Sequence, residues 1–312
     1  MEILVCVKRV PDTAENEFEL NSEGNDLDRD DLVYSVNEWD NYAVEEAIQI
    51  VDNVGGSVTV VTVGDDDAEE VLRREMAMGA NNGVLLSDDA FEGSDGKGIA
   101  TILKAEVEKG NYDLILTGAQ ADEGAGQVGG MLAAMLDLPY ASLVNKIEVN
   151  GDSMIKVGRE IEGGNQEMNE IDLPCVLSIQ TGINEPRYVG IRGIRKVDKV
   201  EIPVKSAEDL GIDAAKDGEA GAKTKRVEYY VPDLGEGAVG AAVGAAVGDL
   251  EVGAVGKLGE HPGGAGGRVG GGLPGDRRGD AVHLPRGEEE VHLREFPGQF
   301  LVPLGQAPGH HQ

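Results

Sequence analysis

The chain has 312 residues, 40% of them hydrophobic, and it carries 58 Asp and Glu against 27 Lys and Arg, a net charge of −31. This acidity disfavours nucleic acid and anionic membranes as partners, because both need a basic protein face. No apolar run approaches the length of a membrane-spanning helix, and the apolar run near the start is too short for a secretion signal. We therefore expect a cytoplasmic protein whose two cysteines, Cys6 and Cys175, are free and buried.

The predicted elements alternate between strand and helix from the start of the chain. Short apolar runs rich in β-branched residues predict strands over 3–7, 58–63, 84–86 and 114–117. Helical spacing of apolar residues, or a helix-forming composition, predicts helices over 41–51, 67–78, 97–109 and from about residue 127 onward. The alternation predicts an α/β fold, a Rossmann-like parallel sheet with helices on both faces.

The alternation ends after Pro139. Residues 142–149 and 154–161, on either side of Asn150-Gly151, predict a β-hairpin, and residues 176–180 predict another strand. Residues 200–237 contain prolines and many charges, which predicts an extended arm rather than a second domain.

Residues 238–312 differ in composition from the rest of the chain. They hold all five His residues and 19 Gly in 75 positions, but no Ile, Ser, Thr, Asn, Tyr, Met, Cys or Trp. Flexible linkers use Ser freely, whereas the abundant residues here are those encoded by GC-rich codons. We hypothesise a frameshift near residues 237–239; the alternative is a genuine Gly-rich, disordered tail. The His spacing matches no metal-ligand pattern, so we assign this segment no chemistry.

The remaining 237 residues carry a charge of −28, from 21 basic and 49 acidic residues. Such a surplus repels itself at low ionic strength and is tolerated best in high salt. The charge indicates a salt-adapted protein, similar to those of haloarchaea, although an acidic protein of another source is the alternative.

Residues 1–237 lack the residues of several common catalytic sites. They contain no His, no CxxC pair and no GxxxxGK[ST] motif. These absences argue against His-assisted nucleophilic catalysis, most zinc sites, iron–sulfur clusters and P-loop chemistry. We predict no catalytic residue, no metal site and no bond-making activity of the chain's own.

A glycine-rich loop over 118–130 follows the predicted strand 114–117, and a helix begins near Gln127. Glycines allow close backbone approach, and a helix N-terminus at the carboxyl end of a parallel strand favours phosphate. Asp122 and Glu123 argue against a bare triphosphate and suit a donor, such as a ribose hydroxyl or an adenine amino group. An ordinary glycine-rich turn is the alternative interpretation.

Two further segments lie beside predicted strands or helices. Asn37-Glu38-Trp39-Asp40 precedes the helix 41–51 and includes the one Trp of the chain, and either Asn37 or Asp40 is suited to cap that helix. Lys8-Arg9 follows the first strand, where the two positive charges either face an anion or neutralise neighbouring acids.

Taken together, these segments resemble the beta subunit of the electron transfer flavoproteins. Seven stretches match in family order: VCVKRVPD (5–12), NEWDNYAVEEA (37–47), AMGANNGVLLSD (77–88), LTGAQADEGAGQVGGMLA (116–133), GREIEGGNQEM (158–168), LPCVLSI (173–179) and NEPRYVGIRGIRK (184–196). They span roughly residues 1–200, and VEYYVPDLGEG (227–237) is also similar to the family.

The resemblance implies a subunit that binds an adenine nucleotide and pairs with an alpha subunit carrying the redox-active FAD. The dimer would take electrons from dehydrogenases, such as acyl-CoA dehydrogenases, and pass them to a quinone oxidoreductase or a similar acceptor. The beta subunit would hold AMP for structure, or a second FAD if it is of the bifurcating type. An ATP-binding, stress-type α/β protein of related fold is the alternative function.

The resemblance also implies roles for individual residues. The cofactor-binding positions are Cys6, Asn37, Glu38, Trp39, Asp40, Val63, Asp122, Glu123, Gly124, Ala125, Gly126, Gln127 and Val128. The loop that docks dehydrogenases falls on 188–196, with Tyr188 and Lys196 at its ends and Ile191 at the apolar anchor position. Residues 1–200 would then form the nucleotide-binding domain and 201–237 an arm to the partner subunit, and a frameshift in 238–312 would weaken dimerisation.

Overall fold

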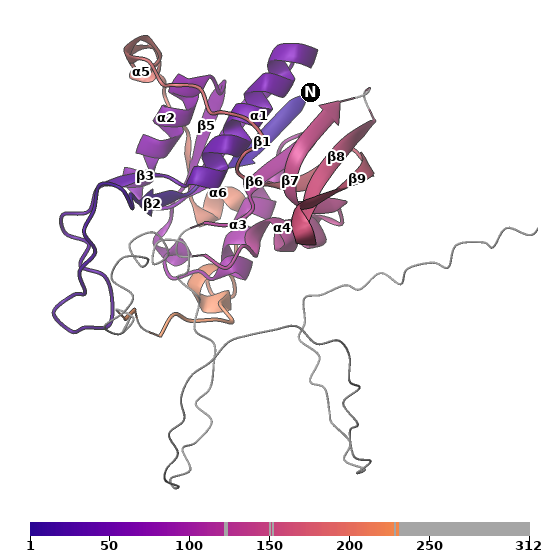
Figure 1. The fold of residues 1–312 in the computed structure, drawn as a ribbon. Coiled ribbons are helices and arrows are strands. Elements are labelled where there is room, and N and C mark those ends of the chain that lie inside the picture. The colour runs from indigo at the N-terminus through magenta and orange to yellow at the C-terminus, as the bar shows by residue number, and fades with distance from the viewer. Residues whose placement is uncertain (122–123, 150, 152, 228, 231–312) are drawn as a thin grey trace, which may run out of the picture. The chain divides into compact units, whose positions relative to one another are not determined.

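The computed structural model describes residues 1–121, 124–149, 151, 153–227 and 229–230 (Figure 1). The strands are β1 (Glu2–Cys6), β2 (Arg9–Pro11), β3 (Tyr34–Val36), β4 (Ser57–Val63), β5 (Asn82–Leu86), β6 (Leu114–Gly118), β7 (Tyr140–Val149), β8 (Met154–Ile161), β9 (Asn165–Asp172), β10 (Cys175–Ile179) and β11 (Val204–Lys205). The α-helices are α1 (Glu38–Val54), α2 (Glu69–Met78), α3 (Gly96–Val107), α4 (Val128–Leu136), α5 (Ile191–Val197) and α6 (Ala207–Leu210). Short 3₁₀ turns lie at Asp66–Ala68, Asp89–Phe91, Glu162–Gly164 and Gly218–Gly221.

Nine of the described strands form one sheet, in the order β11-β5-β4-β1-β6-β10-β7-β8-β9. The strands from β11 to β7 run parallel, while β7, β8 and β9 form an antiparallel meander. Counting from β1, the chain first adds β4 and β5 on one side and then returns to add β6 on the other. The winding therefore reverses between β1 and β6, which is where open α/β sheets form a crevice.

Side chains of the central strands alternate between two apolar cores, as the period of a strand requires. In β1, Ile3 and Val5 face the core that α1 and α2 cover, whereas Leu4 and Cys6 face the core under α3 and α4. Figure 1 shows these two helix pairs on opposite sides of the sheet. The predicted α/β fold with helices on both faces is thus confirmed. None of the described helices is both long enough and apolar enough to cross a membrane.

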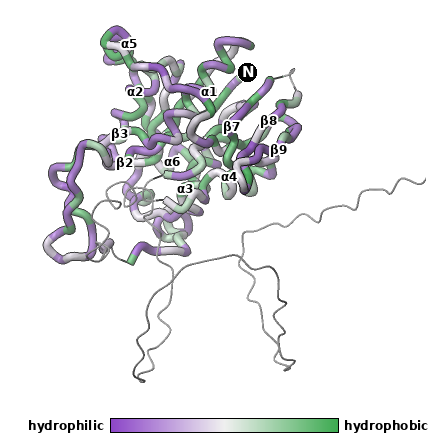
Figure 2. The backbone as a smooth tube through the Cα atoms, viewed as in Figure 1, coloured by the Kyte–Doolittle hydropathy of each residue, from purple (hydrophilic) through white to green (hydrophobic). Residues whose placement is uncertain are grey.

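The small sheet of β2 and β3 was not predicted from the sequence. Its strands have three residues each and pair antiparallel, Arg9 with Val36, only after a long excursion of the chain. That excursion, residues 12–33, is mainly hydrophilic (Figure 2), with nine acidic residues and Arg29 as its one basic residue. The charge of Arg9 is neutralised locally, because its Nε donates to Glu70 at 2.6 Å. Its guanidinium also lies over the Tyr34 ring, 3.7 Å from the ring centre.

The predicted hairpin is confirmed as β7 and β8, but the structure adds a third strand, β9. All but one of the β9 residues are at least partly exposed, and Ile171 alone is buried. Its sequence, NQEMNEID, has neither alternation nor strand-forming composition, so pairing with β8 decides its conformation. Asn150, in the predicted turn, lies outside the described residues.

Residues 201–230, expected as an extended arm, lie against the body of the domain as far as they are described. β11 adds to the sheet edge beside β5, and Lys205 Nζ donates to the buried Glu106 of α3 at 2.7 Å. The Asp95 carboxylate, at the start of α3, accepts the backbone N–H groups of Lys223 and Thr224. The next residues of the predicted arm, 231–237, and the tail 238–312 fall outside the described part of the chain.

Candidate functional site

Those implied cofactor-binding residues that the structure describes come together where β4, β1 and β6 end. Cys6 lies at the end of β1 and Val63 at the end of β4, while Gly124–Gln127 lie in the loop between β6 and α4. Residues 37–40 begin α1, which follows β1 in the chain. Since β4, β1 and β6 are neighbours in the sheet, these segments share one edge, which we call the carboxyl edge. It lies at the point where the winding of the sheet reverses.

Asp40 ties the carboxyl edge together through its two carboxylate oxygens. One oxygen accepts the backbone N–H of Lys8, after β1, and the other accepts that of Gly118, at the end of β6, both at 2.8 Å. The side chain is buried, and burial raises its pKa to about 7 although the two N–H donors and nearby Lys8 act in the opposite direction. A single carboxyl group therefore links the backbone just after β1 to the end of β6, the two strands that flank the reversal.

Asn37 occupies the N-cap position of α1, but its side chain does not cap the helix. It is fully buried, and its amide nitrogen donates instead to the carbonyl of Gln120 in the glycine-rich loop, at 2.9 Å. Of the two predicted N-cap residues, Asn37 is the one at that position, but its side chain binds the loop instead of a backbone N–H of the helix. Its Oδ1 has no hydrogen-bond partner among the described residues, which leaves one buried acceptor at the carboxyl edge.

The other residues of this edge differ in exposure. Trp39 is partly buried, and its indole N–H donates to Oε1 of Gln180, just beyond β10, at 3.0 Å. Glu38 is exposed and Val63 is partly buried. Cys6 is buried, and burial together with the neighbouring Asp40 raises the pKa of its thiol. A raised pKa keeps the thiol protonated, which argues against a nucleophilic role for Cys6.

Where the glycine-rich loop follows β6, its backbone packs closely against the start of α1. A Cβ on Gly118 would meet Trp39 Cβ at 2.7 Å and would also strike Asp40 Oδ1, so the start of α1 requires glycine there. Gly126 has a φ of +63° and lies against the carbonyl of Ala119. Residues 124–127 are exposed, and Val128 is partly buried where it begins α4. Asp122 and Glu123, predicted to face a ligand, lie outside the described residues.

The first turn of α4 rests on a small network of hydroxyl groups. Ser178 Oγ lies 2.8 Å from Thr117 Oγ1 and 2.9 Å from the Tyr140 hydroxyl, so β6, β10 and β7 are linked beneath the helix. A Cβ on Gly129 would strike both Ser178 and Thr117, so the helix can approach this closely only with glycine. Gln127, the N-cap residue, makes no capping bond with its side chain, which leaves backbone N–H groups of the first turn for a ligand.

The carboxyl edge therefore suits the binding of a nucleotide better than chemistry on one. It offers a glycine-rich loop, a helix N-terminus and a buried amide oxygen, the groups that bind phosphates and donors. Within the described residues, no group of three or more His, Cys, Asp or Glu side chains is arranged to hold a metal ion. A cavity of about 390 Å³, bordered by Asn82, Glu106 and Tyr112, lies at the opposite edge and includes none of the predicted residues.

The segment predicted to dock dehydrogenases, residues 188–196, lies apart from these residues. The Tyr188 side chain is 92% exposed and Ile191 is 68% exposed, and Lys196 is exposed as well. The structure adds Ile194, 51% exposed on α5, which the sequence analysis did not single out. A helical spacing of three residues from Ile191 was the available signal for it. Three large apolar side chains thus stand in solvent on one short segment.

The fold and the carboxyl edge define a doubly wound α/β protein, with the implied binding residues at the reversal of its sheet. Residues 25–210 match the electron transfer flavoprotein domain. The chain is 37% identical over 239 residues to the electron transfer flavoprotein subunit beta of Methylophilus methylotrophus, covering 75% of this chain and 90% of the relative. It is 40% identical over 235 residues to the corresponding subunit of Thermoanaerobacterium thermosaccharolyticum, covering 75% of this chain and 89% of the relative.

A third relative carries a different name. The Caffeyl-CoA reductase-Etf complex subunit CarD of Acetobacterium woodii is 35% identical over 256 residues, covering 80% of this chain and 96% of the relative. The chain therefore belongs to the electron transfer flavoprotein family, on the side of its beta subunits. The resemblance seen in the sequence is thereby confirmed.

Proposed function

We propose that this chain is the beta subunit of a heterodimeric electron transfer flavoprotein. Its partner, an alpha subunit, holds the redox-active FAD, and the dimer carries electrons from acyl-CoA or other dehydrogenases to a quinone oxidoreductase or a similar acceptor. This chain itself makes and breaks no bonds. The proposal is supported by one observation above all: Asp40 and Asn37 tie the start of α1 to the segment after β1 and to the glycine-rich loop after β6.

The nucleotide in this subunit is AMP, bound at the carboxyl edge. The exposed loop 124–127 and the first turn of α4 hold its phosphate through backbone N–H groups. The unpartnered Oδ1 of Asn37 accepts a hydrogen bond from a donor of the nucleotide, since a buried acceptor without a partner is costly. The nucleotide supplies no chemistry of its own and stabilises the loops around it.

A second FAD in place of AMP is the competing possibility. It is favoured by the similarity to a subunit of the caffeyl-CoA reductase-Etf complex. The adenosine half of FAD would use the same loops as AMP, so the carboxyl edge alone does not separate the two ligands.

The test is to co-express the chain with an alpha subunit in high salt and identify the nucleotides released from the purified dimer by mass spectrometry. We expect one FAD and one AMP per dimer. Two FAD and no AMP would replace the AMP proposal with a bifurcating subunit. A dimer without any adenine nucleotide beyond one FAD would contradict binding at the carboxyl edge altogether.

We further propose that residues 238–312 result from a frameshift. The first two relatives cover 75% of this chain but about 90% of their own length, which agrees with a terminal quarter foreign to the family. Resequencing the gene tests this proposal, since an intact frame through codon 240 would contradict it. A repaired chain is expected to bind the alpha subunit more tightly than the chain as it stands.

We also propose that the protein is salt-adapted, because its charge of −31 repels itself. Raising the salt concentration from about 0.1 M to about 1 M shortens the screening length from about 10 Å to about 3 Å. The unfolding temperature is therefore expected to rise over that range. A constant or falling unfolding temperature would contradict the proposal.

A further inference from the structure

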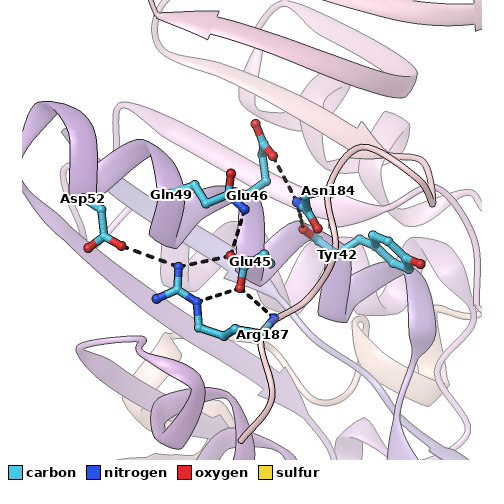
Figure 3. Close-up of polar contacts among 7 residues, drawn as sticks. All are labelled: Tyr42, Glu45, Glu46, Gln49, Asp52, Asn184 and Arg187. Atoms are coloured by element: carbon cyan, nitrogen blue, oxygen red, sulfur yellow. Dashed lines mark hydrogen bonds and ion pairs between the residues drawn. The ribbon is translucent and has the colours of Figure 1, made fainter.

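Segment 188–196 is held by contacts at both of its ends. Just before it, Arg187 reaches back to α1, 142 positions away in the sequence, and contacts Glu45 (Figure 3). Arg187 Nε donates to Glu45 Oε2 at 2.8 Å and its Nη2 donates to Oε1 at 3.0 Å, while the backbone N–H of Arg187 donates to Oε2 at 3.1 Å. The guanidinium also reaches Asp52 at 3.5 Å. Both the side chain and the backbone of this residue are thus fixed on the helix.

A second contact fixes the chain three residues earlier. Asn184 donates from its amide nitrogen to the carbonyl of Tyr42 at 3.1 Å and to Glu46 Oε2 at 3.0 Å (Figure 3). Glu45 and Glu46 are both buried, although they stand beside the apolar residues Val44 and Ala47. Buried carboxylates on the inner face of a helix need partners, and the chain before segment 188–196 supplies them.

The ionised state of Glu45 is held by this contact. Burial by itself would raise the pKa of the carboxyl group, but hydrogen bonds from Arg187 and Gln49 bring its pKa below the ordinary value. Because the guanidinium binds in a two-pronged manner, the contact fixes orientation as well as distance.

The far end of the segment is fixed on α2. A Cβ on Gly193 would strike the carbonyl of Ala77, and Arg73 donates to the carbonyl of Val197 at 2.7 Å. Val197 is buried, in contrast to the isoleucines before it. Between two fixed ends, the exposed Tyr188, Ile191 and Ile194 side chains are presented from a defined backbone. Apolar side chains that stay exposed on a fixed support are typical of a protein-binding surface.

We propose that Glu45 and Arg187 form a clamp that positions segment 188–196 for contact with a partner protein, an inference that rests on the proposed docking role of the segment. The hydrogen bonds and ion pairs of Arg187 go to Glu45 and Asp52 of α1. Both are positioning residues, which set the direction in which the segment leaves α1.

The clamp is tested by hydrogen–deuterium exchange with mass spectrometry on the full chain, comparing the wild type with R187Q, E45Q and the double variant E45Q/R187Q. R159Q is the matched control, because Arg159 is 35% exposed, like Arg187 at 38%, and pairs with the exposed Glu167. We expect R187Q to raise the exchange rate of residues 188–197 by about tenfold, while the exchange rates of peptides from β1 and β6 stay unchanged. The double variant is expected to exchange no faster than R187Q, because no buried carboxylate is left unpaired.

Two outcomes would overturn the clamp. One is unchanged exchange of residues 188–197 in R187Q, and the other is equal acceleration in β1, β6 and the segment, which would mean that the pair holds the whole fold. Electron transfer from an acyl-CoA dehydrogenase to the reconstituted dimer adds a separate readout, in which R187Q should raise KM with kcat unchanged. Faster exchange with an unchanged KM would support the clamp and contradict the docking role of the segment instead.

Discussion

The carboxyl edge and segment 188–196 are both attached to α1, but their side chains face in opposite directions. At the first turn of α1, Asn37 and Asp40 are turned inward and bind backbone groups of neighbouring loops. One to two turns later, Glu45 anchors a segment whose large apolar side chains point outward. A small-molecule site needs fixed donors and acceptors around a crevice, whereas a protein-docking surface needs exposed apolar groups on a fixed base. The first region should therefore respond to changes of charge and backbone, and the second to loss of apolar contact.

The largest expected effect is the pH dependence that Asp40 confers. Its pKa is raised to about 7 by burial, so between about pH 4 and pH 7 the folded state keeps a proton that the unfolded chain releases. The free energy of unfolding therefore falls as pH rises through this window, by on the order of 4 kcal/mol from this group, and the effect levels off above pH 7. Urea unfolding at several pH values measures it. Asp40→Asn cannot titrate, and an equally steep slope in that variant would contradict the assignment.

A methyl group at Gly118 should disturb the carboxyl edge without touching segment 188–196. In Gly118→Ala, the added Cβ would meet Trp39 and Asp40, and the resulting shift is expected to cost about 2 kcal/mol of stability. Binding of AMP, measured by calorimetry on the dimer, should weaken with it. Gly190→Ala is the control, because a Cβ there meets nothing within 4 Å and the residue lies outside the carboxyl edge. Equal AMP affinity in the wild type and Gly118→Ala would argue against a nucleotide at this edge.

In segment 188–196, a substitution should weaken partner binding and leave stability and AMP binding unchanged. Ile191→Ala removes an exposed side chain, so stability should change by less than about 0.5 kcal/mol and AMP binding should be unaffected. The KM of the dimer for a dehydrogenase should rise about tenfold, as for loss of an apolar anchor at an interface. Steady-state electron transfer measures it. Val33→Ala serves as control, since Val33 is also exposed, at 51%, but lies outside the segment. If both variants raise KM alike, Ile191 is not the anchor.

The smallest expected effect is a difference in stability between alanine variants of two glycines in the same loop. Gly126 has a φ of +63° and lies near the carbonyl of Ala119, whereas Gly124 is not in a left-handed conformation. Gly126→Ala is expected to cost about 1 kcal/mol in urea unfolding, and Gly124→Ala close to nothing. Similar costs for the two variants would show that this backbone geometry is not required for the loop.

The alternation of elements and the parallel sheet could be predicted from the sequence, because apolar runs of strand length and helical spacing report local burial. It also placed the glycine-rich loop and the residues 37–40 at strand ends or helix starts. Once strands are parallel and the winding reverses, such segments must meet at one edge. Positions 184–196 were recognised by resemblance, and the exposure of Tyr188, Ile191 and Ile194 agrees with a surface role.

The partners of these side chains, in contrast, depend on how distant parts of the chain pack together. Asn37 was suited to cap its own helix, but it binds the carbonyl of Gln120, 83 positions away. Glu45 stands on the apolar face of α1, where the need for a cation was a usable signal, yet nothing local identified Arg187 as its partner. The strand β9 likewise forms because β8 lies beside it. Pattern and composition describe what a residue requires, whereas register and topology determine which distant group is close enough to supply it.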